Sequence, residues 1–230
     1  MDDLYPDHES ILHYIDWTAA KGFAGLELGS RSLHHFTETF DAKFASQIGE
    51  SLESNSLELP QIMCGFVVHF VMTRSRKEAT EMLDLVFDRV ASTSCKVVGS
   101  SASEIPNILT IRNAVYPEAP PSRIQLSGRF SWADAWEGYI EALQLCVAVA
   151  DSHGLRFALE ARPREMVSTT DGLLRLFNEV GGSNFGALVD TAHLFVQREY
   201  LPLSLHKLGE KIFGVHLTDS DGLIEHHWVP

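Results

Sequence analysis

Apolar residues follow two alternating spacings along this chain. In some stretches they recur three and four positions apart, which is typical of amphipathic helices, and these stretches alternate with short uninterrupted apolar runs. The predicted helices cover residues 8–22, 41–56, 76–93, 131–154, 168–182 and 203–211. The predicted strands cover residues 23–29, 59–65, 95–101, 155–160, 185–190 and 212–219. Within 76–93 the helical spacing predicts a buried stripe through Met82, Leu85, Val86 and Arg89–Val90.

The predicted strands are apolar on both faces and are separated by helices, a pattern typical of parallel sheets buried under helices. A doubly wound sheet and a TIM-type (β/α)8 barrel both fit this pattern. No GxGxxG or GxxxxGK[ST] motif follows any predicted strand, which removes the usual evidence for a nucleotide-binding doubly wound sheet. In TIM barrels the catalytic groups lie at the carboxyl ends of several strands, where Glu160, Asp190 and His216 fall. We therefore predict one α/β domain over residues 1–230, built as a TIM-type barrel.

The composition narrows the range of partners. Of the 230 residues, 45% are hydrophobic and 21% are charged, as is ordinary for a soluble globular protein. The net charge of −13 at pH 7 repels phosphate backbones, so we expect no nucleic-acid partner. No apolar run approaches the roughly 18–20 residues of a membrane span, and the acidic N-terminus does not resemble a signal peptide. We expect a cytoplasmic protein with no membrane partner, in which the widely spaced Cys64, Cys95 and Cys146 are reduced, mostly buried thiols.

Residues 102–130 break the alternation of helices and strands. This stretch is rich in proline and shows no helical period. Long loops inside compact domains are commonly functional. Two interpretations stay open, a cover over an active site and a surface excursion.

Charged and polar side chains follow several of the predicted strands. Glu160 and Asp190 end two apolar runs, His193 follows the second run, and His216 lies late in a third. Neighbouring strands lie roughly 5 Å apart, so two carboxylates and an imidazole would converge at one mouth of the barrel. Buried like charges are costly at such distances unless a cation joins them. We therefore predict a divalent metal site, for which a mixed carboxylate and imidazole set suits Mn, Mg, Co, Fe or Zn.

Each of these residues also has an ordinary structural explanation when it is taken alone. An aspartate after a strand is commonly a helix N-cap or a loop residue, as Asp190 would be, and His216 alone would be a hydrogen-bonded core histidine. The regular placement of such residues at successive strand ends favours the metal site, because capping does not require that regularity.

The segments RFALEARP, ALVDTAH and FGVHLTDSDG, followed by EHHWVP, resemble the second half of the xylose-isomerase-like TIM barrels. This superfamily contains sugar and sugar-phosphate isomerases and epimerases together with endonuclease IV. The resemblance covers residues 8–230 in its rhythm and residues 155–230 in its motifs. It implies a glutamate at the fifth strand, Asp-x-x-His at the sixth and a histidine at the seventh, followed by a loop with a further histidine.

The resemblance implies a role for each matching residue. Glu160, Asp190 and His216 are implied as three of four metal ligands, and Glu160 is also implied as a catalytic base. His193 is implied as a catalytic residue that contacts a substrate hydroxyl, and His227 as a substrate-binding residue of the loop.

Further residues are matched to the substrate side of the site. Glu27 matches a glutamate of the second strand, and a structural hydrogen-bond acceptor is an equally good interpretation of it. Arg162 or Glu165 would reach a substrate from the loop after Glu160. Asp219 and Asp221 resemble a polar pair after the seventh strand, where they would orient His216 or cap the loop.

The sequence departs from the family pattern at both ends. The first strand is not readable, and neither is the eighth, which carries the fourth metal ligand of the family, a glutamate. About six to seven parallel strands with outer helices are therefore expected, in a barrel truncated at both ends. An open barrel leaves unpaired edges, so a homo-oligomer or a partner segment would cover its open side.

The leading hypothesis for function is a metal-dependent isomerase or epimerase of carbohydrate metabolism that acts on a sugar or polyol derivative. It would remove a proton alpha to a carbonyl and give an enediolate. A keto-sugar lyase or dehydratase of the same superfamily is an alternative, since proton abstraction comes first in both. A non-catalytic truncated remnant is a second alternative. Endonuclease IV-like cleavage, with His69 recruited from a loop, is disfavoured by the acidic charge.

Overall fold

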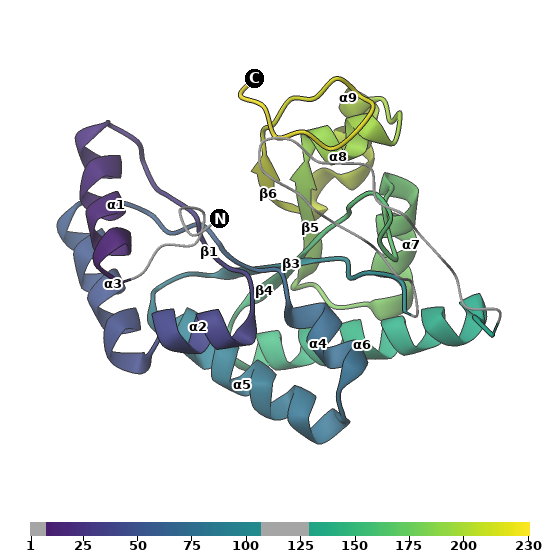
Figure 1. Cartoon of the computed structure of the whole chain (residues 1–230), viewed down its shortest axis with the longest axis horizontal. Helices are drawn as coiled ribbons and strands as arrows, with labels where there is room; N and C mark the ends of the chain where they lie inside the picture. Colours follow the sequence, from purple (N-terminus) through teal and green to yellow (C-terminus); the bar gives the residue numbers. More distant parts are fainter. Residues whose placement is uncertain (1–7, 107–128) are drawn as a thin grey trace. The chain divides into compact units, whose positions relative to one another are not determined.

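The computed structural model describes residues 8–106 and 129–230. A single six-stranded sheet contains, in this order, β1 (Leu28–Ser30), β2 (Ile62–Cys64), β3 (Val97–Ser101), β4 (Arg156–Glu160), β5 (Phe185–Asp190) and β6 (Ile212–His216) (Figure 1). The strands are parallel and alternate with helices along the sequence, which confirms the prediction of an α/β, TIM-type and incomplete barrel. The chain divides into two compact units, Met1–Ser100 with Cys146–Phe157 and Ser101–Leu145 with Ala158–Pro230.

The first unit contains the three N-terminal strands. Its β1 pairs with β2 at Leu28 and Ile62, and β2 pairs with β3 at Ile62 and Val98, both in parallel. Its helices are α1 (His8–Ala20), α2 (Leu33–Thr39), α3 (Ala42–Ser54), α4 (Val67–Thr73) and α5 (Arg76–Ser92). The fully buried side chains of this unit include Ile15, Phe36, Ile48, Ile62, Leu83 and Phe87. Apolar helix faces are thus buried with the strands, as expected for a parallel sheet.

Local capping sets where the helices of this unit begin. The Asp41 carboxylate accepts hydrogen bonds from the amides of Lys43 and Phe44, and α3 starts at the next residue. The hydroxyl of Ser75 and the carboxylate of Glu78 form a reciprocal capping box at the start of α5. Such contacts satisfy amides that have no partner inside the helix.

Three details of the first unit differ from the sequence-based prediction. The strand predicted at 23–29 starts only at Leu28, because Gly25 makes one isolated bridge to Glu58 rather than a continuous ladder. Leu85 is 38% exposed while Leu83 and Phe87 are buried, so the buried face of α5 is rotated from the predicted stripe. His69 lies in helix α4 and not in a loop.

The second unit contains the C-terminal strands and the sequence motifs. Its β5 and β6 are parallel, with Asp190 paired in register with His216, and they lie side by side in Figure 1. Every residue of β5 is buried, which agrees with its unbroken apolar sequence. The helices that follow β4 and β5 are α7 (Thr170–Val180), α8 (Thr191–Val196) and α9 (Leu201–Leu208), with a 3-10 turn at Gly209–Lys211. Helix α6 (Trp132–Ser152) begins in this unit, where the Ser131 hydroxyl accepts a hydrogen bond from the Asp134 amide.

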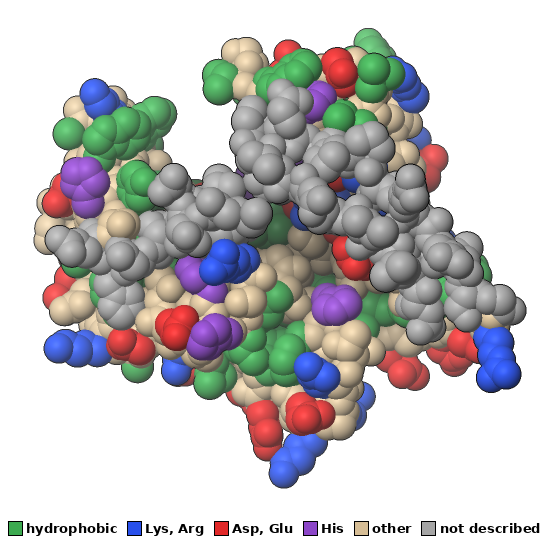
Figure 2. Space-filling view, viewed as in Figure 1, with side chains coloured by type: hydrophobic (Ala, Val, Ile, Leu, Met, Phe, Trp, Pro, Cys, Tyr) green, Lys and Arg blue, Asp and Glu red, His purple; other side chains and the backbone are tan. Residues whose placement is uncertain are grey.

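Four further expectations concern the stretch 102–130, membrane-spanning helices, the cysteines and the surface charges. The stretch 102–130 lies mostly outside the described residues, which leave out 107–128. Among the helices in the described part of the chain, none is long and apolar enough to cross a membrane. Cys64, Cys95 and Cys146 are free and buried, as predicted. Acidic and basic side chains are interspersed over the face shown in Figure 2.

Candidate active site

The site residues of the second unit lie where its strands end. Glu160 is the last residue of β4, and Asp190 and His216 are the last residues of β5 and β6. Because Asp190 and His216 are partners in register, parallel pairing alone brings their backbones together. The structure thus brings together the three residues predicted as metal ligands.

The side chains of Glu160 and His216 are in direct contact. The Nδ1 atom of His216 lies 2.9 Å from Oε1 of Glu160, whose side chain is only 5% exposed. The Nε atom of Arg162 lies 3.7 Å from the other oxygen of Glu160. Burial alone would raise the pKa of Glu160, but hydrogen bonding to His216 and the positive charge of Arg162 hold this pKa below its ordinary value. Glu160 is therefore an ionised carboxylate at neutral pH.

The two oxygens of Asp190 have different partners. Oδ1 accepts hydrogen bonds from the amides of Ala192 and His193 at 2.9 and 3.2 Å, so Asp190 is the N-cap of α8. Oδ2 lies 3.5 Å from Nε2 of His227, 3.9 Å from Nε2 of His193 and 4.0 Å from Nδ1 of His216. The helix cap weighed from the sequence is present on Oδ1, and Oδ2 faces the imidazoles, while the role of Asp190 as a metal ligand stays a prediction.

Burial alone would also raise the pKa of Asp190. The hydrogen bonds from His227 and from the hydroxyl of Thr218 outweigh this effect and hold the pKa below its ordinary value. Asp190 therefore stays ionised at neutral pH and can serve as an anionic ligand.

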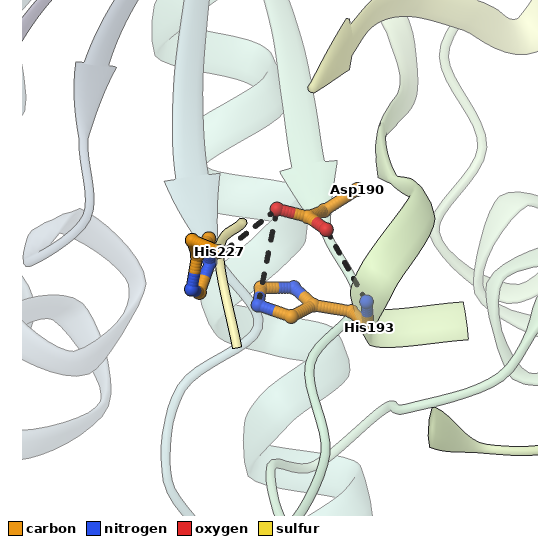
Figure 3. A group of neighbouring side chains, drawn as sticks. All are labelled: Asp190, His193 and His227. Atoms are coloured by element: carbon orange, nitrogen blue, oxygen red, sulfur yellow. Dashed lines mark hydrogen bonds and ion pairs between the residues drawn. The ribbon is translucent and has the colours of Figure 1, made fainter. Parts of the chain in front are cut away.

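His193 lies deepest in the cluster, on helix α8. It is 1% exposed, and neither ring nitrogen has a hydrogen-bond partner among residues 8–106 and 129–230. Its ring meets the ring of His227 edge to face, with centroids 5.2 Å apart, and both rings turn toward Asp190 (Figure 3). Burial lowers the pKa of His193, so the ring is neutral. A buried imidazole with two unused nitrogens is a feature that a ligand would explain.

Two groups of residues in this cluster have the geometry to hold a metal ion. They are Glu160, Asp190 and His216, and Asp190, His193 and His227, and within each group the ligand atoms lie within 4.8 Å of one another. Oxygen and nitrogen donors of this kind suit first-row divalent cations. The donor chemistry and the unused nitrogens of His193 therefore fit the predicted cation.

The remaining predicted residues have varied surroundings. Arg162 lies near Glu160 and also 4.0 Å from the carboxylate of Glu165. Glu27 lies in the first unit, where its carboxylate accepts a hydrogen bond from the side-chain amide of Gln61 at 2.6 Å. The predicted substrate-binding role of Glu27 stays a prediction.

The predicted polar pair after the seventh family strand shapes the loop between Asp219 and Trp228. Asp219 pairs with Trp228 through two backbone hydrogen bonds, of 2.9 and 3.1 Å. The carboxylate of Asp221 accepts from the amides of Leu223 and Ile224. These contacts agree with the expectation that the pair caps the loop.

Sequence reasoning missed three residues that support the cluster. Thr218 donates its hydroxyl to Oδ1 of Asp190 at 2.7 Å. Arg164 forms an ion pair with Glu225, which is 5% exposed. Thr218 was detectable as the polar residue two positions after His216, but nothing in the spacing of Arg164 and Glu225 indicated that they pair.

The fold and the cluster define an α/β barrel-type protein with a group of carboxylates and imidazoles at the carboxyl ends of its strands. The sequence profile of the family described as "Xylose isomerase-like TIM barrel" matches residues 15–230. The chain belongs to this family, which confirms the resemblance of its motifs. A comparison with curated proteins gives no match.

Several solved structures share the fold. A D-psicose 3-epimerase, solved in the presence of D-fructose, has a TM-score of 0.70 at 17% identity over 91% of this chain and 68% of that chain. The 3-keto-D-glucoside 4-epimerase YcjR from E. coli has a TM-score of 0.69 at 17% identity over 94% and 75%. The probable 3-DHS dehydratase AsbF from Bacillus anthracis has a TM-score of 0.69 at 14% identity over 90% and 67%. At these identities the likeness establishes the fold and leaves the substrate open.

Proposed function

We propose that the chain is a divalent-metal-dependent isomerase or epimerase of a sugar or polyol derivative. The observation that carries the proposal is the convergence of Glu160, Asp190 and His216, whose ligand atoms lie within 4.8 Å of one another at the ends of β4, β5 and β6. Family membership and the epimerases among the similar structures support the same class of reaction.

Glu160, Asp190 and His216 would hold the cation. When bound, a divalent cation supplies Lewis-acid polarisation of a carbonyl oxygen. The two carboxylates are ionised, so they bring two negative charges to the ligand set without a proton to displace. The hydrogen bonds on Oδ1 of Asp190 leave Oδ2 directed toward the cluster.

Glu160 is the residue proposed to move the proton. Its carboxylate is in the basic form, and His216 and Arg162 lie on its two oxygens. Glu160 would take the proton alpha to a substrate carbonyl, which gives an enediolate. In an isomerisation the Glu160 carboxyl group would return this proton at the neighbouring carbon, whereas in an epimerisation a second acid on the opposite face of the substrate would supply one.

His193 and His227 are proposed to bind the substrate. The neutral ring of His193 offers one donor and one acceptor nitrogen, which suits a hydroxyl group that needs both. His227 lies edge to face against it and presents Nε2 to Asp190. Both histidines therefore line the same place as the proposed ligand Asp190 (Figure 3).

The charges around the cluster favour an unphosphorylated substrate. Arg162 lies beside Glu160 and Glu165, and Arg164 is paired with Glu225. Each guanidinium is already offset by a buried carboxylate, and a phosphate would have to compete with it. A neutral polyhydroxy ketone does not require such an exchange.

A lyase or dehydratase acting on a keto-sugar is the second candidate, because the dehydratase AsbF shares the fold at a similar TM-score. Both reactions begin with proton removal by a base such as Glu160. They differ in the product, since elimination of water adds a double bond and lowers the mass of the substrate by one water.

The test combines metal content with turnover. Elemental analysis of the purified protein, of Glu160→Gln and of Glu165→Gln compares two buried carboxylates, of which only Glu160 belongs to a ligand group. We expect wild type and Glu165→Gln to bind Mn²⁺ or Co²⁺ and Glu160→Gln to bind at least about tenfold less tightly. Incubation with D-psicose in D₂O should put one deuterium on the carbon next to the carbonyl. Equal metal content in all three proteins would refute the ligand assignment.

A further inference from the structure

A second buried ion pair joins the loop after β4 to the loop after β6, and neither candidate metal group uses it. The guanidinium of Arg164 donates a hydrogen bond to Oε1 of Glu225. The Glu225 side chain is 7% exposed and the Arg164 side chain is 23% exposed. Ion pairs this shielded from water are costly to break on one side, because the remaining charge loses its partner.

The backbone holds Arg164 in a fixed position. Around it, the Arg162 amide donates to the Val167 carbonyl at 3.2 Å, and the Glu165 amide donates to the Arg162 carbonyl at 3.2 Å. The Met166 amide donates to the Ser103 carbonyl at 2.9 Å. Arg164 itself has a φ of 69°, in the left-handed region that residues other than glycine seldom adopt. Such a conformation persists where the surroundings impose it.

Glu225 lies two residues before His227 in a loop that is closed on itself. The backbone pairs of Asp219 with Trp228 join the ends of this loop. Between Glu225 and the end of the loop, the ring of His226 stacks on the ring of Trp228, with centroids 4.4 Å apart and an angle of 7° between the planes. The segment that carries His227 is thus fixed by the stack on one side and by the ion pair on the other.

We propose that Arg164 is a positioning residue of this site, which acts through Glu225 to hold the ring of His227 against Asp190 and His193. In the structure, Nε2 of His227 lies 3.5 Å from Oδ2 of Asp190. The contribution of this placement to substrate binding rests on the proposed function, whereas the placement itself does not.

The alternative is that the pair only stabilises the fold. Arg164→Gln and Glu225→Gln each leave one buried charge without its partner and lower stability. The double variant Arg164→Gln/Glu225→Gln leaves none, so its stability should return toward that of the wild type. If the pair only stabilised the fold, the position of the His227 ring and the KM of the double variant would also return to those of the wild type. If Arg164 positions His227, the ring stays displaced in the double variant.

The ring of His227 can be observed without turnover. In protein labelled with ¹⁵N-histidine, we expect the His227 ring signals to shift in both single variants and in the double variant. The control is Arg175→Gln, which breaks the more exposed ion pair of Arg175 with Glu179 on α7, and it should leave these signals unchanged. Wild-type His227 signals in the double variant would overturn the proposal.

Kinetics supply the second readout. With D-psicose and Mn²⁺, we expect the double variant to raise KM about tenfold, the range found for outer-shell residues, while the Kd for Mn²⁺ changes less than about twofold. An unchanged KM would overturn the role of Arg164 in substrate binding. If the wild type turns over no ketose at all, the proposed function fails, and the His227 signals still decide whether Arg164 positions the ring.

Discussion

Thr218 donates its hydroxyl to the same Asp190 oxygen that caps helix α8, at 2.7 Å. Three donors thus converge on Oδ1 and fix the plane of the carboxylate. The other oxygen, Oδ2, faces three imidazoles as a result. The cap of α8 and the proposed metal ligand are the same side chain, and substitutions can separate the two roles.

Asp190→Asn should remove the ligand and keep the cap. The amide oxygen can still accept from Ala192, His193 and Thr218, while the neutral amide nitrogen replaces Oδ2. We expect Mn²⁺ binding to fall at least about tenfold, with the cap's contribution to the unfolding free energy retained.

Asp190→Ala is the matched variant that removes both functions. It should lose about 1 kcal/mol more than Asp190→Asn in urea unfolding of the metal-free proteins, because the first amides of α8 lose their acceptor. Equal stability of the two variants would show that the cap contributes nothing.

Thr218→Val tests the orientation of the carboxylate. The substitution keeps the shape of the side chain and removes the hydroxyl that holds Oδ1 of Asp190. We expect the Kd for Mn²⁺, measured by calorimetry, to rise about tenfold, as is typical when a side chain that hydrogen-bonds to a metal ligand is removed. Thr80→Val, on the exposed face of α5, is the control and should leave the Kd unchanged. An unaltered Kd in Thr218→Val would mean that backbone amides alone orient the ligand.

The lowered pKa of Asp190 predicts how the metal-free protein responds to acid. A carboxyl group whose pKa is lower in the folded state contributes stability above its unfolded pKa, about 3.9, and loses it as the pH falls toward the folded pKa. The unfolding free energy should therefore decrease from about pH 5 downward. Asp190→Asn cannot take up this proton, so its stability should fall less steeply over the same range. Parallel curves from urea unfolding would contradict the shift.

The three cysteines should react slowly with alkylating reagents. Burial raises the pKa of Cys95 to about 11 and raises the pKa values of Cys64 and Cys146 as well, so the reactive thiolates are scarce. Iodoacetamide at pH 8 should label the native protein far more slowly than the urea-unfolded protein. Mass spectrometry of tryptic peptides measures each site, and rapid labelling of native Cys64 would contradict its burial.

The sequence predicted best those elements whose burial is uniform. The strand at 185–190 has the predicted bounds, because all its residues are buried and its apolar run has no interruption. The strand predicted at 23–29 is instead Leu28–Ser30, because the pairing near Gly25 is limited to a single bridge. The pattern of apolar residues does not show where strand pairing stops. In the same way Leu85 fits the helical spacing and still lies outside the buried face.

The candidate site was likewise predictable only in part. Glu160, Asp190 and His216 were predictable, since parallel strands bring their last residues to one edge of the sheet. The pairing of Arg164 with Glu225 depends on the paths of two irregular loops, for which hydrophobic periodicity carries no information. The double role of Asp190 was also not predictable, because it depends on which oxygen faces which neighbour.

The loop between Asp219 and Trp228 has a consequence for how specificity could diversify in this family. Its ends are joined by its own backbone, and its base carries Glu225 and His227, whereas Leu223 is 70% exposed. Side chains at position 223 can therefore vary in size and charge while the anchored base keeps His227 in register. The neighbouring Gly222 cannot vary in this way, because it has a φ of 73° and packs against Phe195.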